Sequence, residues 1–180
     1  MPAKEKMDAV ALLKADHRTV EELFEKFESA RGESSKKKIA EQICMELIIH
    51  TQIEEEIFYP ACAGQVEDDE LVPEAYVEHD GAKVLIAEIL ASEPSDEFYD
   101  AKVNVLSEMI KHHVKEEEKR VEGLFAEAKE AGLDMEALGE QLQARKQELK
   151  QQYKSGLPTP QTRSFKGHDL EQGMPVEQAA

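Results

Sequence analysis

A histidine and a glutamate lie four residues apart at two places in the chain, His50 with Glu54 and His113 with Glu117. Residues separated by four positions share one face of a helix. An imidazole nitrogen and a carboxylate oxygen stacked one turn apart can therefore bind the same metal ion. Two such helices facing each other could hold a site for two metals.

Two further histidines could complete this site. His17 lies on an apolar stripe between Leu13 and Val20, and His79 shares a helical face with apolar residues. A lone histidine on such a stripe is more often a hydrogen-bonded core residue than a ligand. Four histidines at similar depth, one on each of four helices, are harder to explain separately, because burying an unpaired imidazole is unfavourable. A shared metal site satisfies all four together.

The glutamates indicate the kind of metal. Glu54 and Glu117 are in phase with the histidines, and a buried carboxylate is costly unless it is paired or metal-bound. Imidazole with carboxylate and without thiolate suits iron or manganese, with zinc also possible. Two bridging carboxylates would hold two metals roughly 3.5–4 Å apart. We expect the neighbouring glutamates to face solvent, namely Glu55, Glu56, Glu116 and Glu118.

His112 competes with His113 for the place of the ligand, because each has a glutamate four residues later. Leu106, His113 and Glu117 keep one heptad phase, which favours His113. His112 is then expected at the surface or behind the ligands.

Composition and charge narrow the class of protein. The 180 residues suit one domain and are rich in helix formers, without useful strand-like alternation, so we predict an all-α fold. The net charge of −17 argues against nucleic acid or a membrane as a partner. No run approaches the roughly 18 apolar residues of a membrane span, and no secretory signal is visible. We expect a cytoplasmic protein in which Cys44 and Cys62 are free thiols.

The patterns predict an up-down-up-down four-helix bundle with an additional C-terminal helix and an extended or disordered tail. The bundle occupies residues 1–132, the accessory helix 133–155 and the tail 156–180. Leu138, Leu142 and Leu149 form the narrow stripe of the accessory helix, which packs on the bundle or on a partner. The expected helices run over residues 8–30, 36–59 (stopped by Pro60), 73–91, 97–131 and 134–153.

Four segments carry a resemblance to the hemerythrin-like, or HHE cation-binding, family: Lys14–Val20, His50–Pro60, Glu78–Asp80 and His112–Glu118. It spans about residues 8–130. The resemblance implies a four-helix bundle around two non-heme iron ions (Fe2+/Fe3+) with an oxo or hydroxo bridge, with manganese or zinc as alternatives. It further implies terminal histidine ligands and bridging carboxylates at His17, His50, His79, His113, Glu54 and Glu117.

Two departures separate the chain from the oxygen-carrying members that it resembles. Lys83 stands where they have a further histidine, and Glu117 stands where they have an aspartate. A site that lacks this histidine would have an open coordination position, or another protein ligand such as Tyr76 or Glu21 would fill it. We therefore expect a protein that binds or senses O2, NO or peroxide, as a monomer or homodimer. The alternatives are a di-iron redox enzyme, for peroxide disproportionation or O2 reduction, and an iron-storage or interaction protein.

Overall fold

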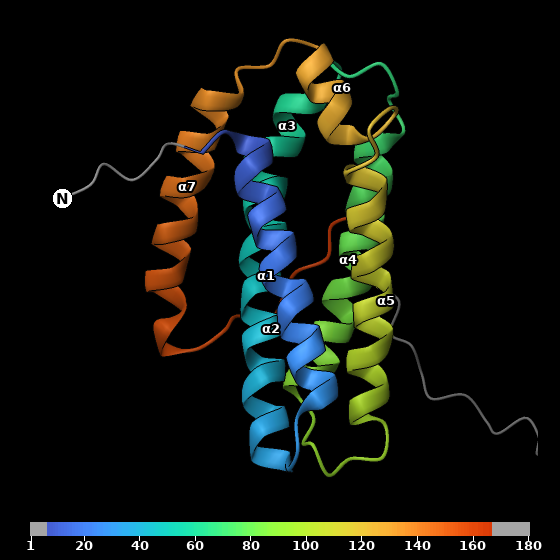
Figure 1. Ribbon diagram of the computed structural model, residues 1–180, viewed down its shortest axis with the longest axis vertical. Helices are drawn as coiled ribbons and strands as arrows, with labels where there is room; N and C mark the ends of the chain where they lie inside the picture. Colours follow the sequence, from blue (N-terminus) through green and yellow to red (C-terminus); the bar gives the residue numbers. More distant parts are fainter. Residues whose placement is uncertain (1–6, 167–180) are drawn as a thin grey trace, which may run out of the picture.

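The computed structural model describes residues 7–166, and over that range the chain is helical without strands. Four long helices run alternately up and down: α1 (Ala9–Ser29), α2 (Glu33–Ile53), α4 (Leu71–Leu90) and α5 (Tyr99–Glu117) (Figure 1). The predicted all-α class and the helical bundle are confirmed. Residues 167–180 of the predicted tail lie outside the described residues.

A polar layer crosses the bundle between two apolar clusters. His17 on α1 lies between Leu13, which belongs to one cluster, and Val20, which belongs to the other. His50 on α2 likewise lies next to residues of both clusters. Apolar packing on each side holds the helices in register, because burial of these side chains is the main favourable contribution to folding. The layer between them is where polar side chains can meet away from water.

The second helix does not stop at Pro60 as the sequence suggested. It passes through a π-helical segment, Glu54–Phe58, into the short helix α3 (Tyr59–Cys62), and the Tyr59 N–H donates to Glu54 O. Pro60 has no N–H to give to the carbonyl four residues earlier, and the wider π turn accommodates this loss. The wider turn brings Glu54 and Tyr59 to the same side of the helix.

The helix predicted over 97–131 is broken, which corrects that expectation. α5 ends at Glu117, and α6 (Leu124–Glu130) begins after a turn in which Glu122 has φ 63°. A Cβ at Gly123 would lie 2.6 Å from the carbonyl oxygen of Lys119, so this close approach requires glycine. Val121, expected on the apolar stripe, is 72% exposed as a result.

The last long helix, α7 (Met135–Gln152), packs against α1 and α2 along the outside of the bundle (Figure 1). Its three stripe leucines are buried in the chain's own core: Leu138, Leu142 and Leu149. A 3-10 turn, Tyr153–Ser155, leads into residues 156–166, which return towards α4 without regular structure. Cys44 and Cys62 are free and buried, as expected, and burial raises the pKa of each thiol to about 12. None of the described helices is long and apolar enough to span a membrane.

Candidate metal centre

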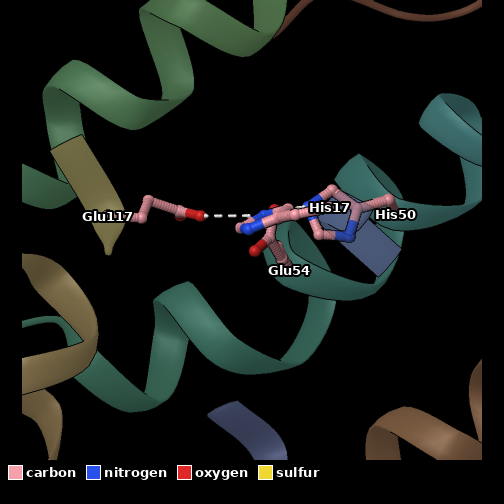
Figure 2. A group of neighbouring side chains, drawn as sticks. All are labelled: His17, His50, Glu54 and Glu117. Carbon is pink, nitrogen blue, oxygen red and sulfur yellow. Dashed lines mark hydrogen bonds and ion pairs between the residues drawn. The ribbon is translucent and has the colours of Figure 1, made fainter. Parts of the chain in front are cut away.

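The polar layer gathers the six predicted residues into two groups that share Glu54. One group contains His17, His50, Glu54 and Glu117, and the other contains Glu54, His79 and His113. Within each group the potential ligand atoms all lie within 4.8 Å of one another, and every residue is buried. Figure 2 shows Glu117 reaching towards His17 from the opposite side of the first group. The fold thus brings together all six side chains singled out from the sequence.

The histidines form two pairs through their Nε2 atoms. The distance between Nε2 of His17 and Nε2 of His50 is 3.1 Å, and the distance between the same atoms of His79 and His113 is also 3.1 Å. Two imidazole nitrogens this close can share a proton or bind one cation. Each pair joins two different helices, so the arrangement offers one cation position per pair.

Both carboxylates span the two pairs. Glu54 Oε2 lies 3.1 Å from Nε2 of His50 and 3.4 Å from Nε2 of His79. Glu117 Oε2 lies 3.4 Å from Nε2 of His17 and 3.6 Å from Nε2 of His113. Glu54 and Glu117 therefore each lie close to one histidine of each pair. A carboxylate in this position could bind one metal ion with each of its two oxygens, or two metal ions with a single oxygen.

Each histidine also has a carboxylate at its other ring nitrogen, Nδ1. The distances are 2.7 Å for His17–Glu118, 3.6 Å for His50–Asp16, 3.0 Å for His79–Glu55 and 2.7 Å for His113–Glu78. A carboxylate behind a metal-binding histidine fixes the ring orientation and leaves Nε2 free to ligate. Glu55 and Glu118 are therefore not the solvent-facing residues that the sequence suggested, because neighbouring helices place histidines against them.

The carboxylates around the histidines raise the affinity of this layer for protons. Burial alone would lower the pKa of His50, but Glu54 and Asp16 outweigh it and raise this pKa to about 10. The pKa of His113 is also raised, against burial, by Glu117 and Glu78. Burial works to raise the pKa of Glu54, and His50 lowers it well below its usual value. The layer attracts positive charge, which protons or metal ions can supply.

Tyr59 is a member of the layer that the sequence analysis did not identify. Its hydroxyl donates to Glu117 Oε1 at 2.9 Å and lies 3.1 Å from Nε2 of His79. Burial and the charges of Glu117 and Glu54 raise the pKa of this phenol well above its usual value. Pro60 inside a helical pattern was the available signal, since a π turn before it shifts the face on which Tyr59 lies.

The other residues considered for ligation lie elsewhere. The His112 side chain is 64% exposed, whereas His113 is buried. The Tyr76 hydroxyl contacts the backbone oxygen of Glu55 at 3.4 Å, and Glu21 pairs with Arg18 at the surface. Lys83 is buried and points to carboxylates beside the layer, so it does not enter either group.

The layer fits a bound cation by a test independent of spacing. Glu54 Oε1 and Glu117 Oε2 are buried and have no hydrogen-bond partner among the described residues. Orphaned carboxylate oxygens are costly in an apolar interior unless a cation satisfies them. An enclosed void of about 10 Å³ is lined by all four histidines, close to the volume that one water-sized species needs. The void is lined by the histidines and not by Glu54 or Glu117, so the fit to a cation rests on the donor atoms and on the unsatisfied carboxylate oxygens.

One side of the layer borders the surface. A groove of about 720 Å³ lies between α4 and α5 and is lined by His79 and His113 together with residues such as Ala82, Met109 and Ile110. Its wall is largely apolar, with Glu78 and Glu108 among the polar residues. A small molecule could reach the second histidine pair through it.

A helical bundle around a buried layer of histidines and carboxylates is typical of metal-binding proteins. Sequence comparison identifies the family to which this one belongs. Residues 8–125 match the hemerythrin HHE cation binding domain, so the chain belongs to that family. The crystal structure of an HHE cation-binding-domain protein from Mycobacterium kansasii has the same fold, with a TM-score of 0.67 and 22% identity. That match covers 81% of this chain and 89% of the other.

A protein named DNA nickase, from Nostoc sp. (strain PCC 7120), is 27% identical over 115 residues. The aligned part is 64% of this chain but 32% of the nickase, so the chain spans about a third of that relative's length.

Proposed function

We propose that this chain is a non-heme di-iron protein that binds or senses O2, NO or peroxide. The observation that carries the proposal is the pair of Nε2–Nε2 contacts joined by two spanning carboxylates. Nitrogen and oxygen donors without thiolate suit iron, and two irons can supply two electrons to one small molecule. In this protein each histidine pair would hold one iron, and Glu54 and Glu117 would each reach both irons.

The surrounding residues have separate tasks in this function. Glu118, Glu55 and Glu78 lie within hydrogen-bond distance of Nδ1 of His17, His79 and His113 and orient these rings. The apolar clusters exclude bulk water from the layer. The groove between α4 and α5 admits a diatomic or peroxide-sized ligand to the half that holds His79 and His113. Ligand exchange is therefore expected at that half.

Anaerobic reconstitution with ferrous iron tests the proposal. We expect about two irons per chain and, after exposure to air, near-ultraviolet charge-transfer absorption. Less than one iron per chain after reconstitution would overturn it.

A redox enzyme is the second candidate, favoured by the Tyr59 hydroxyl. A phenol 2.9 Å from Glu117 Oε1 and 3.1 Å from Nε2 of His79 can hold or deliver a proton beside the metals. Oxygen evolution from added peroxide, compared with His113→Ala, separates catalysis from binding. Equal rates in the two proteins would reject catalysis at this site.

Neither storage nor DNA processing gains support from a specific feature. The leucines of α7 are buried in the chain's own core and do not form an exposed seam for a partner. The net charge of −17 is unfavourable for binding phosphate, so we propose no nucleic-acid partner and do not carry over the nickase activity.

A further inference from the structure

A buried carboxylate of α4 anchors the segment after α7 to the bundle. Asp80 on α4 accepts hydrogen bonds from the backbone N–H groups of Arg163 at 2.8 Å, Ser164, and Phe165 at 3.2 Å. The Ser164 hydroxyl adds a fourth bond to Asp80 at 2.7 Å. We call residues 157–166 the strap. Backbone donors converging on one carboxylate make a specific anchor, since charged hydrogen bonds are stronger than neutral ones.

A second contact holds the strap beside the metal layer. The Arg163 guanidinium lies over the ring of Tyr76, 4.2 Å from its centroid. The Tyr76 ring in turn packs edge-on against Tyr59 at 5.2 Å. A cation over an aromatic ring adds stabilisation that does not depend on Asp80.

From Asp80 a continuous line of charged contacts leads to one metal-binding histidine. Lys83 Nζ lies 3.3 Å from Asp80 Oδ1 and 2.7 Å from Glu55 Oε1. Glu55 Oε1 lies 3.0 Å from Nδ1 of His79. The side chains of Lys83 and Asp80 are 7% and 1% exposed, so water screens these contacts weakly.

The strap also forms one wall of the space around these contacts. A cavity of about 360 Å³ is lined by Glu55 and Lys83 on the bundle side and by Pro158, Pro160 and Arg163 on the strap side. Without the strap, the Lys83–Glu55 ion pair would be more exposed to water, and Asp80 would lose four hydrogen bonds. Lys83 would then be drawn towards Asp80, and Glu55 would be less firmly placed against His79.

We propose that the strap positions His79 for metal binding through Asp80, Lys83 and Glu55, so that strap docking and metal binding favour each other. The proposal rests on the proposed metal site. Asp80, Lys83 and Glu55 act here as positioning residues, and none of them touches the metals. Linkage requires the effect to be reciprocal: bound metal must hold the strap down by the same factor as the strap holds the metal.

The first experiment uses the unaltered full chain and trypsin, which cleaves after Arg163. Docking protects the Arg163–Ser164 bond, so iron-loaded protein should be cut there more slowly than iron-free protein. Cleavage after Lys154, which lies before the strap, serves as the internal control and should not slow to the same degree. Equal rates at Arg163 with and without iron would overturn the proposal, even if the protein binds two irons.

The second experiment compares iron release to a chelator among three variants. Ser164→Pro removes both the N–H and the hydroxyl that reach Asp80, Ser164→Ala removes the hydroxyl alone, and Thr159→Pro places a proline in the strap away from Asp80. Loss of a group that orients a metal-binding histidine typically weakens binding about 10–100-fold. We expect release about tenfold faster for Ser164→Pro, a smaller change for Ser164→Ala and none for Thr159→Pro.

The variant Lys83→Met tests whether the strap acts on His79 through Lys83. If the contacts through Lys83 carry the effect, adding Ser164→Pro to Lys83→Met will not speed iron release further. Full additivity would exclude this route and overturn the proposal. If the unaltered chain binds two irons and Ser164→Pro releases them at the unaltered rate, the strap proposal fails while the di-iron function stands. If the unaltered chain binds no iron, both fail.

Discussion

All four histidines of the centre are buried, but His79 and His113 also line a groove between α4 and α5, whereas an aromatic ring covers His17. The Phe125 ring stacks on His17 with centroids 5.8 Å apart. The groove between α4 and α5 measures about 720 Å³. Histidine pairs with the same Nε2 separation therefore lie in different surroundings. The difference teaches that the ligand set alone does not decide where an external molecule can bind.

One carboxylate behind each half, Asp16 and Glu55, differs in the same sense. Asp16, behind His50, is paired with Lys146 of α7, so the half that holds His17 and His50 is supported by a packed helix. Glu55, behind His79, is paired with Lys83 and through it with the strap. A helix sharing the core is a stable support, whereas a short segment held by a few hydrogen bonds can open locally at lower cost. The half of the centre that borders the groove thus also contains the histidine whose carboxylate partner depends on the strap.

Removing Glu54, which belongs to both groups of potential ligands, should produce the largest effect. Glu54→Ala takes a donor from each group, so we expect iron content to fall from about two per chain to a small fraction. Metal analysis after anaerobic reconstitution measures this. Glu56→Ala, two positions away and paired with Arg145, is the matched control and should keep both irons. Retention of two irons by Glu54→Ala would show that the halves do not share this residue.

Lowering the pH should release metal, because protons compete with it for the histidines. The pKa of His50 is raised to about 10, so the metal-free layer holds a proton on this histidine at neutral pH, and the pKa of His113 is raised as well. Metal must displace bound protons, so affinity should fall as pH falls, by about tenfold per pH unit for each proton displaced. Equilibrium dialysis between pH 6 and 9 measures the slope, and we expect iron to be lost by about pH 5. Full iron content at pH 4 would contradict a histidine-rich site.

Filling the groove should have the smallest of the three effects and should touch one half alone. Met109 lines the groove, and its methyl group lies close to Gly81: a Cβ added at Gly81 would be 2.7 Å from it. A side chain larger than methionine at position 109 would therefore have to extend into the groove. Met109→Trp should slow the binding of NO roughly tenfold, equivalent to about 1.4 kcal/mol of added barrier. Stopped-flow absorption measures the rate, with Val121→Trp at an exposed position as the control. An unchanged rate, with both irons present, would place the entry route elsewhere.

Much of the fold could be predicted because helical patterns are local. The apolar spacing of α1 predicted its limits within a residue or so, and the broad bundle followed from four such segments. The fourth helix was predicted too long, because its break depends on a close contact between Gly123 and the Lys119 backbone that no periodicity reveals. The π segment after α2 was missed for a similar reason: Pro60 signals an irregularity but does not say which one.

The sequence by itself determined which side chains face the interior of each helix. Spacing by four residues places His50 with Glu54, and His113 with Glu117, whatever surrounds them. Only the tertiary structure decided what stands behind these residues. The Nδ1 partners, the approach of Tyr59 and the anchoring of the strap on Asp80 join segments that are distant in the sequence or lie beyond an irregular turn. Such contacts depend on how helices are rotated and offset against one another, and local periodicity carries no information about that.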